Sequence, residues 1–234
     1  MGGQSAGEVA ARLVLTELAD AVRDAAAADG LLRAGILNGI ERANVAIKDL
    51  GVGAATTLAA VEVEDGRIRP YHVGDSMVLV VGQKGKVKLQ TVSHSPVGYA
   101  VESGLLSETD ALHHEDRHLV SNAVGSGEMR IEVGPTLQLR PRDTVVLASD
   151  GLFDNLHTNE IIEHVRKGPL RKATHSLVAV CNERMRRPRE GVPSKPDDLT
   201  CILFRLNAAR SAVNVMRDSS GTRKGSTPGP GPSE

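Results

Sequence analysis

The sequence predicts an α+β fold built on antiparallel strands. Two helical patterns fill roughly the first fifty residues, and apolar runs of period two then follow one another through very short turns. Connections this short join antiparallel strands, because a parallel pair needs a crossover of about a dozen residues or more. The 234 residues are 40% apolar, which is enough for one domain with a real core.

The first helix is expected at residues 5–28, where Ser5 and Glu8 have capping-box spacing and an apolar stripe follows them. The second helical pattern, at 31–51, ends at Gly51. Further along the chain, the same periodicity predicts shorter helical pieces and two later helices, at 97–105, 108–113, 159–167 and 170–186.

The strands are expected in two groups. The first is an antiparallel meander of four strands, at residues 54–64, 67–73, 76–82 and 86–92. After an excursion over the surface, the second group follows at 131–139, 143–149 and 199–206. Residues 1–206 therefore form the predicted domain. Residues 207–234 form a predicted disordered tail, because their Arg, Ser, Gly and Pro bury too little surface to fold.

Composition narrows the classes of function. The net charge is −1 and aromatic residues make up 2% of the chain, so neither a basic footprint nor stacking platforms for nucleic acid are indicated. The sequence shows no signal peptide and no apolar run of about 18 residues, which favours a cytoplasmic protein without membrane contact. Cys181 and Cys201 lie in apolar contexts without metal-ligand spacing and are expected to be buried, reduced thiols.

Four carboxylates each stand where an apolar run ends in a turn: Asp75, Asp150, Asp154 and Asp197. A strand that ends at an Asp places a carboxylate at the rim of a sheet, and converging rims give the oxygen cluster that Mg²⁺ or Mn²⁺ prefers. Taken singly, Gly-Asp-Ser at 74–76 and Asp-Asp at 197–198 are equally typical of turns. Their coincidence favours a metal or proton-transfer site, because unpaired clustered carboxylates repel one another.

Five motifs, in order, resemble the metal-dependent protein serine/threonine phosphatases of the PPM type, also called protein phosphatase 2C. They are Met-Gly-Gly-Gln-Ser-Ala-Gly-Glu-Val-Ala at 1–10, Gly-Ala-Ala-Thr-Thr-Leu at 53–58, His-Val-Gly-Asp-Ser at 72–76, Ser-Asp-Gly-Leu-Phe-Asp at 149–154 and Asp-Asp-Leu-Thr at 197–200. The resemblance covers about residues 1–206. It implies a four-layer α-β-β-α sandwich of two antiparallel sheets flanked by helices.

The resemblance also implies roles for individual residues. Asp150 and Asp197 match ligands of the first catalytic Mn²⁺ or Mg²⁺, while Asp75 and Asp154 match ligands of a third, more weakly held metal. Residues 93–127, with His94, Ser95 and Tyr99, fall where the family carries a substrate flap. The implied activity is hydrolysis of phosphoserine and phosphothreonine, placed there by a Ser/Thr kinase, through a metal-activated water. No catalytic side chain beyond the metal ligands is assigned.

The sequence departs from the family pattern in ways that bear on activity. In the family an Asp-Gly pair, whose Asp bridges two catalytic metals, directly precedes the Met-Gly-Gly motif, whereas this sequence starts at Met1 of that motif. A Glu-Asp pair and a phosphate-binding Arg lie further upstream in the family. We therefore expect an N-terminally incomplete domain with crippled activity. Met77, Ser93 and Asp198 stand where Arg, Asp and Asn are usual.

Three alternatives remain. A catalytically inactive pseudophosphatase would bind phosphoproteins or a kinase without turnover. A haloacid-dehalogenase-type phosphatase is disfavoured, because the segment around Asp150 lacks a second Asp two residues later and the strands are antiparallel. Zinc binding by His113, His114 and His118 is also disfavoured, because Asp neighbours and a loose segment favour exposed surface histidines.

Overall fold

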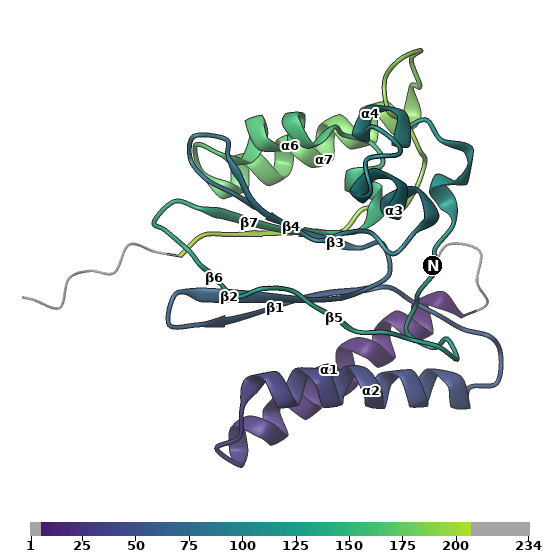
Figure 1. Cartoon of the computed structure of the whole chain (residues 1–234), viewed down its shortest axis with the longest axis vertical. Coiled ribbons are helices and arrows are strands. Elements are labelled where there is room, and N and C mark those ends of the chain that lie inside the picture. Colours follow the sequence, from purple (N-terminus) through teal and green to yellow (C-terminus); the bar gives the residue numbers. More distant parts are fainter. Residues whose placement is uncertain (1–5, 207–234) are drawn as a thin grey trace, which may run out of the picture.

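Helices and sheets stack in four layers in the computed structural model, which describes residues 6–206 (Figure 1). The outer layer on one side contains α1 (Gly7–Ala27) and α2 (Leu32–Asp49). The adjoining sheet consists of β1 (Leu58–Glu64), β2 (Arg67–Val73), β5 (Glu132–Val133) and β6 (Leu137–Gln138). In this sheet β2 is central, pairing with β1 on one edge and with both β5 and β6 on the other.

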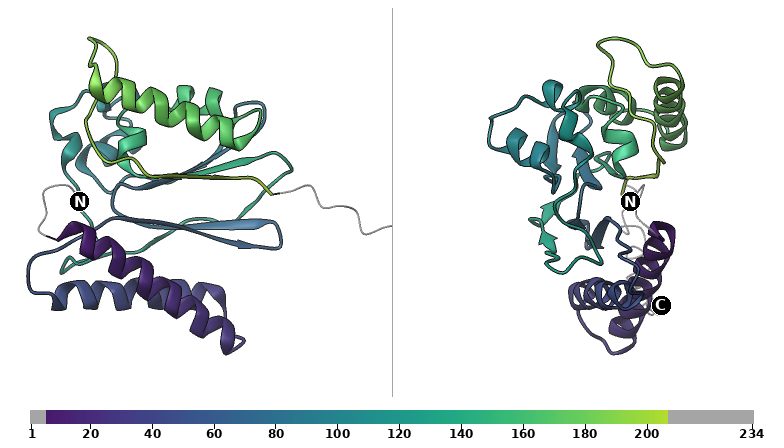
Figure 2. Two further views of the ribbon diagram at one scale, coloured as in Figure 1. Left: turned by 180° about the vertical axis from the view of Figure 1, so that it is seen from behind. Right: turned by 90° about the vertical axis from the view of Figure 1, so that its right-hand side faces the viewer.

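The second sheet has the order β4-β3-β7-β8, and all its pairs are antiparallel. Its strands are β3 (Met77–Val81), β4 (Val87–Gln90), β7 (Thr144–Ala148) and β8 (Cys201–Phe204). The long helices α6 (Thr158–Val165) and α7 (Leu170–Arg186) cover its outer face (Figures 1 and 2). Shorter elements lie beside this sheet: α3 (Pro96–Glu102), α4 (Glu108–Ala111), η1 (Glu115–His118) and α5 (Asp150–Phe153). This arrangement confirms the predicted α-β-β-α sandwich.

Alternation along β3 shows how the layers are held together. Leu79 and Val81 pack in the cluster that faces α6 and α7, whereas Val78 and Val80 pack between the two sheets. All four side chains are fully buried, as expected where successive residues of a strand point to opposite faces and both faces are covered. A third cluster joins α1 and α2 to the other sheet through Tyr71 and its neighbours.

The predicted four-stranded meander is wrong in one respect. β1 and β2 form one hairpin and β3 and β4 form another, but the two hairpins belong to different sheets. The turn at Gly74–Ser76 carries the chain from one sheet to the other. A two-residue turn signal between apolar runs is the same for a hairpin and for such a crossing, so the sequence alone did not separate them.

Other boundaries differ by a few residues, with one larger correction. The strand expected at 131–139 is divided into β5 and β6, because Gly134 and Pro135 interrupt it. The first helix starts at Gly7 after Ala6, whose φ is +58° and whose side chain gives no cap; Ser5, like the predicted tail, lies outside the described residues. None of the helices in the described range is long and apolar enough to cross a bilayer. Cys181 is buried and Cys201 is partly exposed, and both are free thiols.

Candidate active site

Asp150 and Asp154 are presented by the short helix α5, which follows directly from β7. The amide of Asp154 donates to the carbonyl of Asp150 at 2.7 Å, so the two residues are one helical turn apart and their carboxylates lie on the same side. Leu152 and Phe153 anchor the turn in the core beneath α7. The sequence predicted a sharp turn here, and the helix accounts for the spacing of the two carboxylates.

Asp197 is brought to this helix by close backbone packing. A Cβ on Gly151 would lie 2.3 Å from the carbonyl oxygen of Asp198, so only glycine allows the two loops to approach this closely. The approach continues the pairing of β7 with β8. The amide of Ser149 donates to the carbonyl of Thr200 at 3.0 Å, and the amide of Thr200 donates to the Ser149 hydroxyl at 3.1 Å.

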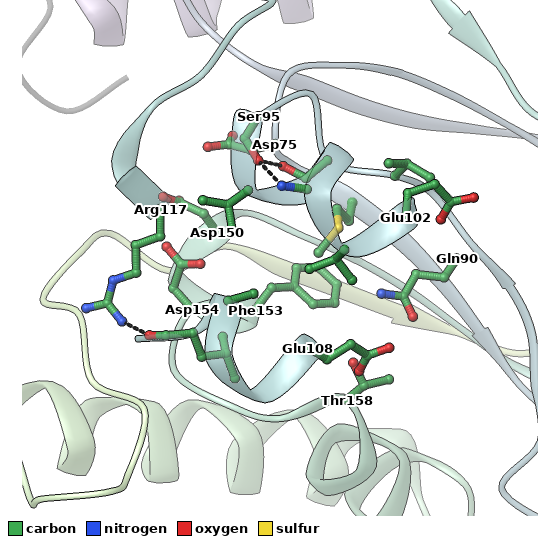
Figure 3. Close-up of a pocket in the computed structure, with 18 of the residues that line it drawn as sticks. Asp75, Gln90, Ser95, Glu102, Glu108, Arg117, Asp150, Phe153, Asp154 and Thr158 are labelled. Carbon is green, nitrogen blue, oxygen red and sulfur yellow. Dashed lines mark hydrogen bonds between the residues drawn. The ribbon is translucent and has the colours of Figure 1, made fainter. Parts of the chain in front are cut away.

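Asp75 enters from the crossing between the two sheets. Gly74 has a φ of +98°, and a side chain there would strike Thr57, so the turn requires glycine. Burial, followed by the charges of Asp150 and Asp154, raises the pKa of Asp75 from 3.8 to about 6. The charges of Asp150 and Asp154 therefore reach Asp75, and Figure 3 shows the three carboxylates gathered at one end of a pocket.

Lys195 is the residue of the cluster that sequence reasoning missed. Its Nζ donates to Asp150 Oδ2 at 2.7 Å and to Asp154 Oδ2 at 2.6 Å, and lies 3.6 Å from Asp197 Oδ2. Burial acts to lower the pKa of Lys195, but the charges and hydrogen bonds of Asp154 and Asp150 outweigh it and raise that pKa. Burial also raises the pKa of Asp154, against the opposing effect of Lys195. The sequence offered one clue to its role: Lys195 lies in a polar turn segment, two residues before Asp197.

The carboxylates Asp75, Asp150 and Asp154 line one end of a cavity of about 300 Å³ (Figure 3). Val97 and Val101 of α3 and Phe153 of α5 are among the apolar side chains of its walls. At this end the carboxylate oxygens lie beside the Ser95 hydroxyl and Arg117, and the Lys195 ammonium bonds two of the carboxylates. This chemistry fits a hard divalent ion such as Mg²⁺ or Mn²⁺ better than a soft metal.

The expected flap residues occupy different environments. Ser95 lines the cavity and caps α3 by accepting a hydrogen bond from the Gly98 amide at 2.9 Å. Tyr99 is 39% exposed, whereas His94 is 3% exposed and turned inward. His94 Nδ1 accepts from the amide of Gly74 at 3.1 Å, and the amide of His94 donates to the carbonyl of Gly74 at 3.0 Å. His94 therefore holds the turn that carries Asp75.

A second group of potential ligands consists of His72, His94 and Glu132, whose ligand atoms lie within 4.8 Å of one another. Because His94 Nδ1 accepts from the amide of Gly74, its proton is on Nε2, which bonds Glu132 Oε2 at 3.0 Å. A metal on that nitrogen would require an imidazolate, so the group does not fit a metal site. Its hydrogen bonds instead join the flap to β5.

The three histidines considered for zinc form no such group within residues 6–206. His113 and His118 are exposed, and His114 Nδ1 accepts from the amide of Asp116 at 3.1 Å. Their surface position agrees with the interpretation that disfavoured zinc.

Comparison with known proteins gives a consistent assignment. The family model described as protein phosphatase 2C matches residues 1–188. A putative protein phosphatase 2C-type protein of Streptococcus pyogenes is 30% identical over 171 residues, which are 69% of this chain and 68% of that protein. The serine/threonine protein phosphatase PstP of Mycobacterium tuberculosis is 31% identical over 187 residues, which are 76% of this chain but only 35% of PstP.

Solved structures agree with the sequence comparisons. A crystal structure of the M. tuberculosis phosphatase PstP has a TM-score of 0.73 and 26% identity, covering 89% of this chain and 86% of that one. The catalytic domain of PstP in complex with two manganese ions has a TM-score of 0.65 and 25% identity, covering 87% and 83% of the two chains. With the model match over most of its length and the same four-layer fold, this chain belongs to the protein phosphatase 2C family.

Proposed function

We propose that the chain hydrolyses phosphoserine and phosphothreonine in phosphoproteins made by a Ser/Thr kinase, with Mn²⁺ or Mg²⁺ as its cofactor. Residues 1–206 would form the catalytic domain, and a cytoplasmic location would suit the free thiols of Cys181 and Cys201. The observation that carries the proposal is the convergence of carboxylates from three separate segments: Asp75 and the pair Asp150 and Asp154 line one end of a cavity, and Asp197 faces the same Lys195 ammonium as that pair. Family membership supplies the reaction class.

The charge of the cavity explains why a metal is needed. A phosphate dianion approaching this end of the cavity would meet Asp75, Asp150 and Asp154, whose charge is only partly offset by Lys195 and Arg117. Glu102 and Glu108 add further negative charge to the lining. Divalent ions held there would neutralise this charge and supply a water of lowered pKa as the nucleophile. In this proposal Asp150 and Asp197 hold the first catalytic metal, and Asp75 with Asp154 holds a more weakly bound ion.

The protein residues then have distinct tasks. α5 keeps Asp150 and Asp154 on one side of a helical turn, and the packing of Gly151 against Asp198 fixes the distance to Asp197. Apolar side chains such as Val101 and Phe153 exclude water from the wall beside the carboxylates. A rigid apolar wall next to a charged floor suits the side chain of a phosphorylated residue and its neighbours.

The test is phosphate release from a phosphothreonine peptide and from an aryl phosphate during a Mn²⁺ titration. Turnover by this chain is expected to be weak, and Asp150→Asn should abolish the Mn²⁺-dependent part of it, because the variant loses a carboxylate of the proposed metal site. Asp49→Asn, on an exposed residue at the end of α2, is the matched control and should leave turnover unchanged. Hydrolysis that needs no metal, or full turnover by Asp150→Asn, would contradict the proposal. Phosphopeptide binding without hydrolysis would instead favour the pseudophosphatase.

A further inference from the structure

Lys195 places an ammonium group among the carboxylates that we assign to the metals. Its Nζ bonds two of them, Asp150 and Asp154, and lies 3.6 Å from Asp197. We propose that Lys195 is an internal cation that competes with the divalent ion: it neutralises the cluster when no metal is bound and leaves it when a metal binds. This inference rests on the proposed metal role of the carboxylates.

Competition follows from the atoms that are shared. The ammonium contacts one oxygen of Asp150 and one of Asp154 at hydrogen-bonding distance, and the carboxylate of Asp197 faces the same nitrogen. A divalent ion held by Asp150 and Asp197 would need the carboxylate oxygens that face the ammonium, and its double charge would repel the ammonium. The metal and the ammonium therefore exclude each other from the centre of the cluster.

The position of Lys195 is built into the fold through its backbone. Asn155 is fully buried, and its Oδ1 accepts from the Lys195 amide at 2.8 Å while its Nδ2 donates to the Lys195 carbonyl at 2.9 Å. The same Nδ2 donates to the Gly151 carbonyl at 3.0 Å, which ties the lysine loop to α5. Arg117 of η1 adds a hydrogen bond to the Ser194 carbonyl at 2.8 Å.

The side chain, by contrast, is free to leave. Lysine carries its charge on a flexible stem of four carbons with three rotatable donors, so the ammonium can swing outward while the backbone stays bound to Asn155. The Lys195 side chain is 18% exposed, so solvent lies within its reach. A fixed backbone with a movable charge is what an exchangeable internal cation requires.

The inference predicts opposite effects on metal affinity and metal-free stability. Lys195→Met removes the competing charge and keeps an unbranched stem of similar length, so Mn²⁺ should bind at least about tenfold more tightly. Without metal, the uncompensated carboxylates should repel one another and lower the Tm. The rise in Tm on adding Mn²⁺ should therefore be larger in Lys195→Met than in the natural sequence.

The experiment measures the Kd of Mn²⁺ from the paramagnetic resonance of free Mn²⁺, and Tm with and without metal, on the full chain. Lys172→Met, at an exposed position of α7, should change neither quantity. Lys195→Arg retains the positive charge, so its Kd for Mn²⁺ and its metal-free Tm should both stay near the values of the natural chain. A Lys195→Met chain that folds only with Mn²⁺ would be an extreme form of the expected result.

Equal or weaker Mn²⁺ binding by Lys195→Met would overturn the inference, as would a metal-free Tm equal to that of Lys172→Met. Phosphate release, measured separately, distinguishes the two proposals. Tighter Mn²⁺ binding in a chain that hydrolyses no phosphopeptide would support the role of Lys195 and contradict the proposed function. If the natural chain and Lys195→Met both hydrolyse the phosphopeptide only with Mn²⁺ and bind Mn²⁺ equally tightly, the proposed function would be supported and the role of Lys195 contradicted.

Discussion

Gly151→Ala is the change that most directly tests how the carboxylate cluster is assembled. The added Cβ would lie 2.3 Å from the Asp198 carbonyl oxygen and 3.1 Å from the Leu199 Cα, which are both backbone atoms. Overpacking of this kind costs about 1–3 kcal/mol. Alanine returns up to about 1 kcal/mol as a better helix residue, so we expect a net loss of about 1–2 kcal/mol.

Such a loss should lower the metal-free Tm by roughly 2–8 °C for a chain of this size. Because the backbone that gives way is next to Asp197, Mn²⁺ binding should also weaken. Gly127→Ala is the matched control, since a Cβ there meets nothing within 4 Å. If Gly151→Ala had the same Tm and the same Kd for Mn²⁺ as Gly127→Ala, the close approach of the two loops would not be what brings Asp150 and Asp197 together.

Three further changes probe the supports of the site. Asn155→Ala leaves three backbone groups without their buried partner and should cost about 3 kcal/mol in urea unfolding, against less than about 0.5 kcal/mol for exposed Asn182→Ala. The pKa of Asp75 is raised to about 6, so its protonated form stabilises the folded state. This contribution is fully present below about pH 4 and is lost as the pH rises through 6, and the metal-free free energy of unfolding should fall by at most about 3 kcal/mol over that range. Asp75→Asn should remove this pH dependence. His94→Ala removes the acceptor of the Gly74 amide and should lower both stability and turnover; unchanged turnover would mean that this contact does not position the turn.

The helices and strands could be predicted from periodicity, and the four layers from the resemblance to the family, but the distribution of the individual strands between the two sheets could not be predicted. The apolar run between two turn signals predicted the strand at 76–82, and the apolar stripes of the first fifty residues predicted α1 and α2. Which strands share a sheet depends on pairings between distant segments, such as Met77 with Ala148. Local turn chemistry at Gly74 carries no information about such pairings.

The dependence on contacts between distant segments also explains which residues of the site could be predicted from the sequence and which could not. Asp75, Asp150, Asp154 and Asp197 were recognisable because each lies in a turn beside an apolar run and matches a family motif. Lys195 belongs to no motif, and its partners are 41 and 45 residues away along the chain. Only the fold, which brings the loop before β8 against α5, places its charge among the carboxylates.

The central claim is that these carboxylates form a divalent-metal site, and anomalous diffraction from crystals grown with Mn²⁺ tests it most directly. We expect a manganese peak between Asp150 and Asp197, with the Lys195 ammonium displaced from its position between Asp150 and Asp154. A map with manganese elsewhere, or with Lys195 still bonded to both carboxylates and no peak beside them, would contradict it.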